Sequence, residues 1–85
     1  MKTFEYTIKD AQGIHARPAG MLVKEAKKYQ SKIMIEKNDR AVEAVKLMAL
    51  MSLGVKCGDE IKVSAEGTDE EEAAVQIQEF LKNNL

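Results

Sequence analysis

The sequence predicts one small α+β domain spanning residues 1–85, and three observations support this. A chain of 85 residues is too short to divide its core between two domains. Its 45% hydrophobic and 32% charged residues are typical of a globular protein rather than of a disordered segment or a disulfide scaffold. Its strand-like and helix-like patterns follow the order βαββαβα, so a small antiparallel or mixed sheet with helices over one face is the simplest packing.

The N-terminal third predicts a strand, a turn and a helix. Phe4, Tyr6 and Ile8 alternate with polar residues, which is the pattern of a strand with one solvated face. Turn-forming residues follow at 10–13, and a helix is expected over about 16–29. The apolar face of this helix carries Ala19, Leu22, Val23 and Ala26.

The middle of the chain predicts a hairpin. Ile33 and Ile35 alternate within a second strand, and Val42 belongs to a short third strand. Between them stand Asn38 and Asp39, which favour a tight turn.

The C-terminal half predicts a short helix, a strand and a final helix. The apolar run 47–53 ends at Gly54, a residue suited to the left-handed conformation that terminates helices. A capping box of Thr68 and Glu71 is expected to begin the final helix, and Lys82 lies near its end. The fourth strand carries Ile61, Val63 and Ala65 on its apolar face. The buried stripe of the final helix is expected to consist of Ala74, Ile77, Phe80 and Leu81.

Charge and cysteine content argue against several classes of protein. With 13 Lys and Arg against 14 Asp and Glu, the net charge of −1 is unsuited to a nucleic-acid binder, although a local basic patch stays possible. The single cysteine, Cys57, excludes an internal disulfide and, with one histidine, leaves no cluster for a metal, so we expect no metal and no cofactor. The longest apolar stretch, 47–51, is far shorter than the roughly 20 residues of a membrane span. We therefore expect a cytoplasmic protein without membrane insertion.

The stretch 13–19, Gly-Ile-His-Ala-Arg-Pro-Ala, contains the residues best suited to chemistry. His15 stands just before the first helix, whose start offers unpaired N–H groups and a partial positive charge to an anion. Residues Ala16, Arg17 and Pro18 form the predicted phosphate-binding helix start, where the Arg17 guanidinium suits phosphate oxygens and Pro18 stiffens the turn.

An imidazole in this position is expected to be neutral near pH 7, because the helix terminus and Arg17 both disfavour its charged form. A neutral ring nitrogen can attack phosphorus, and the attached phosphoryl oxygens would then meet the same N–H groups and guanidinium. A lone histidine is more often an ordinary surface or core residue. His15 becomes a candidate phosphoryl acceptor only through its context.

The short helix at 47–53 is apolar at almost every position, so part of it cannot face the core. Leu47, Met48 and Met51 are expected to form an exposed patch suited to partner docking, unless a neighbouring segment covers them.

These features together resemble the HPr family, the histidine phosphocarriers of the bacterial phosphoenolpyruvate-dependent sugar phosphotransferase system. The similarity lies in the 13–19 motif, in Met-Ser-Leu-Gly at 51–54 and in the element order, and it extends over essentially the whole chain. It implies an open-faced β-sandwich with a four-stranded antiparallel sheet in order 1-4-2-3 and three helices on one face.

The resemblance also implies a function and its partners. Enzyme I, phosphorylated from phosphoenolpyruvate, would pass a phosphoryl group to Nδ1 of His15, and the carrier would deliver it to enzyme IIA proteins. Arg17 would stabilise the phosphoryl group. The partner-docking surface would comprise Gly20, Leu47, Met48 and Met51. A monomer is expected for a carrier that presents one face to successive partners.

Lys46 departs from the pattern of many Gram-positive members, which carry a regulatory serine there. An amine cannot be phosphorylated by the HPr kinase, and Lys46 also lacks the acceptor that a helix N-cap favours. The sequence leaves two other functions open: a regulatory paralogue that reads out the state of His15 without sugar transport, and an enzyme such as a phosphatase. The enzyme is disfavoured because no second catalytic group is evident near His15 in the sequence.

Overall fold

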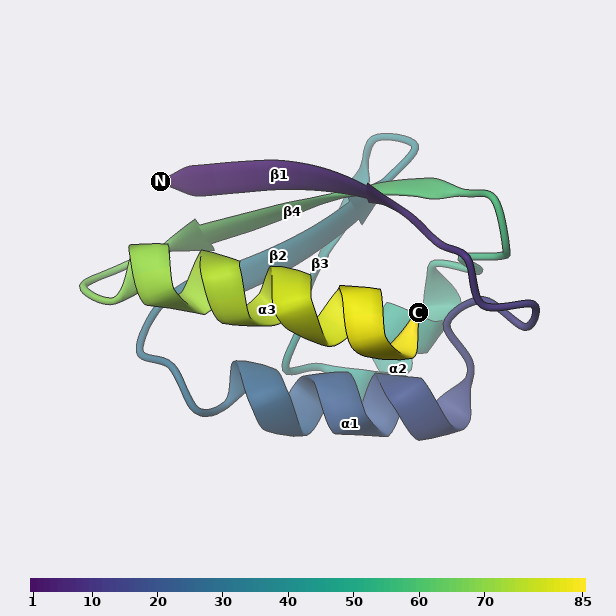
Figure 1. Ribbon diagram of the computed structural model, residues 1–85, viewed down its shortest axis with the longest axis horizontal. Helices are drawn as coiled ribbons and strands as arrows, with labels where there is room; N and C mark the ends of the chain where they lie inside the picture. Colours follow the sequence, from purple (N-terminus) through teal and green to yellow (C-terminus); the bar gives the residue numbers. More distant parts are fainter.

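The computed structural model describes all 85 residues and has the predicted order of elements (Figure 1). The elements are β1 (Lys2–Thr7), α1 (Ala16–Ala26), β2 (Lys32–Lys37), β3 (Arg40–Glu43), α2 (Leu47–Ser52), β4 (Glu60–Glu66) and α3 (Glu70–Asn84). None of the three helices has both the length and the apolar character needed to cross a bilayer.

The four strands form one antiparallel sheet in the order β1-β4-β2-β3. The antiparallel arrangement and the strand order confirm the prediction. In the register, Val63 of the central strand β4 lies opposite Phe4 on one side and Ile35 on the other. Figure 1 shows α1 and α3 side by side against the sheet, and the opposite face of the sheet is open.

The core lies between the sheet and the helices. Alternate residues of the strands point into it, as the period-2 pattern predicted, while their neighbours stay exposed. The largest fully buried side chains are Ile8, Leu22, Ile35, Leu50, Ile61, Val63, Ile77 and Leu81.

Both predicted turn signals are confirmed. Asn38 and Asp39 have φ values of 51° and 67°, as required at the two central positions of a type I′ hairpin turn. Gly54, with φ of 65°, follows the end of α2 in the left-handed conformation.

The predicted end of α1 near residue 29 is wrong, because the helix ends at Ala26. The amides of Lys28 and Tyr29 donate to carbonyls only three residues back, so the chain tightens into turns. The Tyr29 hydroxyl then donates to Glu25 at 2.8 Å. Burial and this bond to Glu25 raise the pKa of Tyr29 to about 12.

The predicted capping box of Thr68 and Glu71 is also wrong. Asp69 occupies the N-cap position of α3, and its side chain makes no capping bond. Its carboxylate instead accepts hydrogen bonds from the amide and hydroxyl of Ser31, 38 residues earlier in the chain, and from the amide of Gln30. A tertiary contact has thus displaced the local one. The reverse half of a box does form one residue earlier, where the Gly67 amide donates to Glu70 Oε1 at 3.2 Å.

The buried stripe of α3 is confirmed in part. Ile77 and Leu81 are buried as predicted, whereas Ala73 is buried in place of Ala74, and Phe80 is only partly buried. Ala73, Ile77 and Leu81 are spaced four residues apart, so they lie along one face of the helix.

Candidate functional site

His15 is the N-cap residue of α1 and stands at the surface. Its backbone is extended, with φ of −107° and ψ of −178°, and its carbonyl accepts the first helical bond from Ala19. The imidazole makes no capping hydrogen bond, and 36% of the side chain is exposed. The ring is therefore accessible to another protein.

The loop before His15 is held by backbone contacts. The amide of Ile14 donates to the Val55 carbonyl at 3.1 Å, and the amide of Asp10 donates to the Leu85 carbonyl at 2.8 Å. Gly13 has φ of 69°, a conformation that glycine adopts without strain. These contacts place His15 at a fixed point beside the end of α3.

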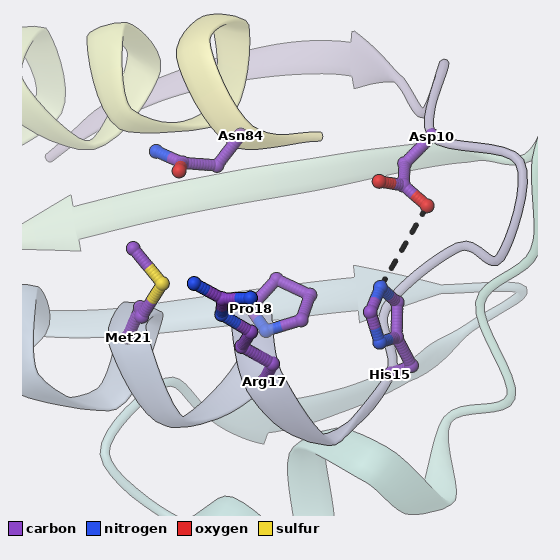
Figure 2. Close-up of a pocket in the computed structure, with 6 residues that line it drawn as sticks. All are labelled: Asp10, His15, Arg17, Pro18, Met21 and Asn84. Atoms are coloured by element: carbon purple, nitrogen blue, oxygen red, sulfur yellow. Dashed lines mark ion pairs between the residues drawn. The ribbon is translucent and has the colours of Figure 1, made fainter.

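The side chain of His15 lines an open pocket of about 270 Å³ (Figure 2). Its lining residues are Asp10, His15, Arg17, Pro18, Met21 and Asn84. Three of them, Asp10, Met21 and Asn84, were not singled out from the sequence. Asn84 lies 69 positions after His15 in the numbering, so no local pattern could connect the two.

Among the pocket residues that the sequence did not single out, Asp10 lies against the imidazole of His15. Its Oδ1 lies 3.7 Å from Nε2 of His15. No second catalytic group near His15 was evident in the sequence, and the structure places a carboxylate there. The sequence showed an acidic residue in a turn, but only the fold of residues 10–15 reveals that it points at the imidazole.

Arg17 lines the same pocket and is exposed. Its guanidinium forms no ion pair and no side-chain hydrogen bond within the chain. In the view of Figure 2 it extends toward Met21 and away from the ring of His15. A long, unpaired side chain of this kind is free to turn toward an anion at the helix start.

The start of α1 is open to an anion. The amides of Ala16 and Arg17 belong to the first turn and have no intrahelical acceptor. Pro18 is buried and has no N–H, so it fixes the turn but adds no donor. The first turn of α1 contains no acidic residue, whereas that of α3 contains three glutamates. The first turn of α1 therefore offers free amides beside the Arg17 guanidinium, without an acidic side chain of its own.

The predicted docking residues are exposed. Met48 of α2 is 78% exposed, and Leu47 and Met51 are 39% and 37% exposed, so all three reach the surface. We call these three residues the apolar patch. Gly20 lies on α1, which contacts α2, and a Cβ there would meet nothing within 4 Å. Neither the pocket nor the patch includes a group of His, Cys, Asp and Glu side chains that could hold a metal ion.

Known proteins similar to this chain identify its family. A family model described as "PTS HPr component phosphorylation site" matches residues 2–83. The chain belongs to the HPr family.

Curated relatives agree with this membership. The phosphocarrier protein HPr of Mycoplasma genitalium is 42% identical over 85 residues, which cover 99% of this chain and 97% of the relative. That of Mycoplasma pneumoniae is 41% identical with the same coverage. HPr proteins are phosphocarriers of the phosphotransferase system, and no family of enzymes is indicated for this chain.

Solved structures of HPr proteins share the fold. HPr of Thermoanaerobacter tengcongensis is 43% identical and superimposes with a TM-score of 0.93, covering 98% of this chain and 93% of that one. A dimer of HPr from the same organism has also been solved, with a TM-score of 0.78. Crh of Bacillus subtilis, a catabolite repression HPr, is more distant, with 34% identity, a TM-score of 0.79 and coverage of 94% and 92%.

Proposed function

We propose that this HPr-family chain accepts a phosphoryl group on Nδ1 of His15 from phosphorylated enzyme I and passes it to enzyme IIA proteins for sugar uptake. The observation that carries this proposal is the position of His15 at the open start of α1, with its ring exposed beside Arg17. The protein would itself be a substrate of the relay rather than an enzyme.

The helix start supplies what a phosphorylated imidazole needs. A phosphoryl group brings negative oxygens that the free amides of Ala16 and Arg17 can bind, with the positive end of the helix dipole behind them. The Arg17 guanidinium can add charge-assisted bonds. The site would therefore stabilise the phosphorylated histidine. Because the site is open, the phosphoryl group would stay accessible to the next protein of the relay.

The apolar patch supports the docking of successive partners. Leu47, Met48 and Met51 present flexible apolar side chains, which adapt to more than one surface. We propose that enzyme I and enzyme IIA proteins both use this patch together with Gly20, one at a time. A single shared docking face also favours a monomer as the acting form, which light scattering at micromolar concentration would test.

A carrier is favoured over a regulatory paralogue. HPr of Thermoanaerobacter tengcongensis is 43% identical with a TM-score of 0.93, against 34% and 0.79 for Crh. Lys46 at the N-cap of α2 provides no hydroxyl for phosphorylation, but a regulator that reads the state of His15 would not need one. Onward transfer to an enzyme IIA is therefore what separates the two functions.

The proposal is tested by mixing the purified protein with phosphoenolpyruvate, enzyme I and a panel of enzyme IIA proteins. We expect one phosphoryl group on the wild type, shown by intact mass spectrometry, and onward transfer to at least one enzyme IIA. His15→Ala should accept none. Arg17→Ala should be phosphorylated more slowly while keeping the fold. Full phosphorylation of His15→Ala would exclude the proposed acceptor, and labelling without onward transfer would point to the regulator.

A further inference from the structure

The carboxylate of Asp10 contacts the ring of His15, and Asp10 has no other charged partner. Its Oδ1 lies 3.7 Å from His15 Nε2, and none of the ion pairs in the structure joins Asp10 to a lysine or arginine. Figure 2 shows the carboxylate aimed at this nitrogen, with Nδ1 on the other side of the ring. The separation is within ion-pair range but longer than a hydrogen bond, and contacts of this kind tighten in a reacting complex.

The position of Asp10 is fixed from several sides. Its Oδ1 accepts a hydrogen bond from the Gln12 amide at 2.8 Å, which closes a turn. Its backbone amide donates to Leu85, and its carbonyl accepts from Gly13 at 3.0 Å. A carboxylate has about four acceptor sites, so the bond to Gln12 leaves capacity for the ring. The Asp10 carboxylate is therefore a hydrogen-bond acceptor fixed in position beside the ring, not a mobile surface charge.

We propose that Asp10 is a positioning residue that keeps the proton of the neutral imidazole on Nε2 and thereby leaves the lone pair on Nδ1. This inference rests on the proposed phosphoryl transfer to His15. A neutral imidazole has one N–H and one bare nitrogen, and a neighbouring carboxylate attracts the N–H and repels the lone pair. The carboxylate thus selects which nitrogen is the nucleophile.

Phosphoryl transfer to Nδ1 requires no proton to leave the ring. The Nδ1 lone pair attacks phosphorus, an N–P bond forms, and the bond from phosphorus to the donor breaks with its electrons returning to the donor. The proton stays on Nε2, so the phosphorylated ring is cationic and lies beside the Asp10 carboxylate. In the onward step the N–P bond breaks, its electrons return to Nδ1, and the ring is neutral again.

The test compares wild type with Asp10→Asn, which removes the charge but keeps a side-chain oxygen for Gln12. The readout is the ratio of the Nε2–H to the Nδ1–H form of His15 in the unphosphorylated protein, measured from ring ¹⁵N chemical shifts in alkaline buffer. We expect Asp10→Asn to lower this ratio by roughly two- to fivefold, the range for a partly exposed charge pair. An equal ratio in the two proteins would overturn the inference.

A matched control and a second comparison keep the test decisive. Glu72→Gln removes one negative charge from the first turn of α3 and should leave the ratio unchanged. If Asp10→Asn does not fold, the ratio in wild type is compared with that in a peptide of residues 12–18, and an equal ratio would again overturn the inference.

The same variants separate this inference from the proposed function. Phosphorylation of Asp10→Asn by enzyme I should slow by less than the factor seen in the ratio, because the rate follows the fraction of rings whose Nδ1 is free. A changed ratio with no phosphorylation of any protein would refute the acceptor role of His15 and leave the positioning role intact. Normal phosphorylation of Asp10→Asn with an unchanged ratio would refute the positioning role of Asp10 and leave the acceptor role of His15 intact.

Discussion

Gly13 lies directly against the carbonyl oxygen of Val55, with no space between them for a side chain. A Cβ atom on Gly13 would collide with that oxygen and would stand 2.7 Å from the Cα atom of Lys56. The same carbonyl accepts the hydrogen bond of Ile14, the residue next to His15. The close approach therefore sets the path of the chain into the site.

Gly13→Ala should destabilise the protein by about 2–4 kcal/mol, because it combines an unfavourable positive φ with a backbone collision. Urea unfolding would measure this. Gly54→Ala is the matched control, since Gly54 has nearly the same φ but nothing within 4 Å of a Cβ. It should lose only the conformational part, about 1 kcal/mol. Equal losses in the two variants would show that the contact with Val55 contributes nothing.

The site motif that contains Gly13 could be predicted from the sequence, whereas the position of Asp10 could not. The motif around Gly13 and His15 was recognisable because a helix start, an arginine and a proline are local features. The alternation of Ile33, Ile35 and Val63 likewise reports burial directly. The position of Asp10 against the ring depends on the Leu85 and Val55 contacts, which join distant parts of the chain. No spacing within the loop encodes them.

The errors in the prediction have the same origin. Thr68 and Glu71 match a capping pattern, but Asp69 satisfies distant amides at Gln30 and Ser31 instead. Local propensity was overridden by a tertiary hydrogen bond there. The family resemblance supplied the strand order, which periodicity alone left undecided.

Met48→Glu should weaken docking without weakening the fold. Met48 is 78% exposed, so the free energy of unfolding should change by no more than about 0.5 kcal/mol. A charge in an apolar interface is poorly compensated, and we expect the KM for phosphorylation by enzyme I to rise about tenfold. Steady-state phosphorylation assays would measure this.

Val75→Glu is the control for that experiment. Val75 is 56% exposed on α3, outside the apolar patch, and its replacement should leave the KM unchanged. Similar KM values for Met48→Glu and wild type would remove the apolar patch from the docking surface.

Lys46→Ser should stabilise the protein by about 0.5–1 kcal/mol. Lys46 is the N-cap residue of α2, with extended φ and ψ of −105° and 98°, and makes no capping bond. A serine hydroxyl could accept from a free amide of the first turn, and the loss of a positive charge at the helix start also helps. The thermal midpoint should rise by a few degrees. Lys46→Ala removes the charge alone, so a rise for alanine equal to that for serine would refute the capping contribution.

The carboxylate of Asp69 makes the stability of the protein depend on acid. Hydrogen bonds from the Ser31 hydroxyl and from the Gln30 and Ser31 amides hold the pKa of Asp69 below its ordinary value of 3.8. A carboxyl whose pKa is lower in the folded state stabilises the fold when ionised, so this contribution is complete well above pH 3.8 and is lost as the pH falls through the folded pKa.

Asp69→Asn should therefore be less stable than wild type at neutral pH, and the difference should shrink on acidification. Urea unfolding of both proteins from about pH 7 to about pH 3 would measure it. Asp39→Asn serves as the control, because Asp39 lies in the hairpin turn and its side chain holds no other segment of the chain. A gap between wild type and Asp69→Asn that stayed constant down to the lowest pH would mean that the ionised carboxylate does not join α3 to the segment before β2.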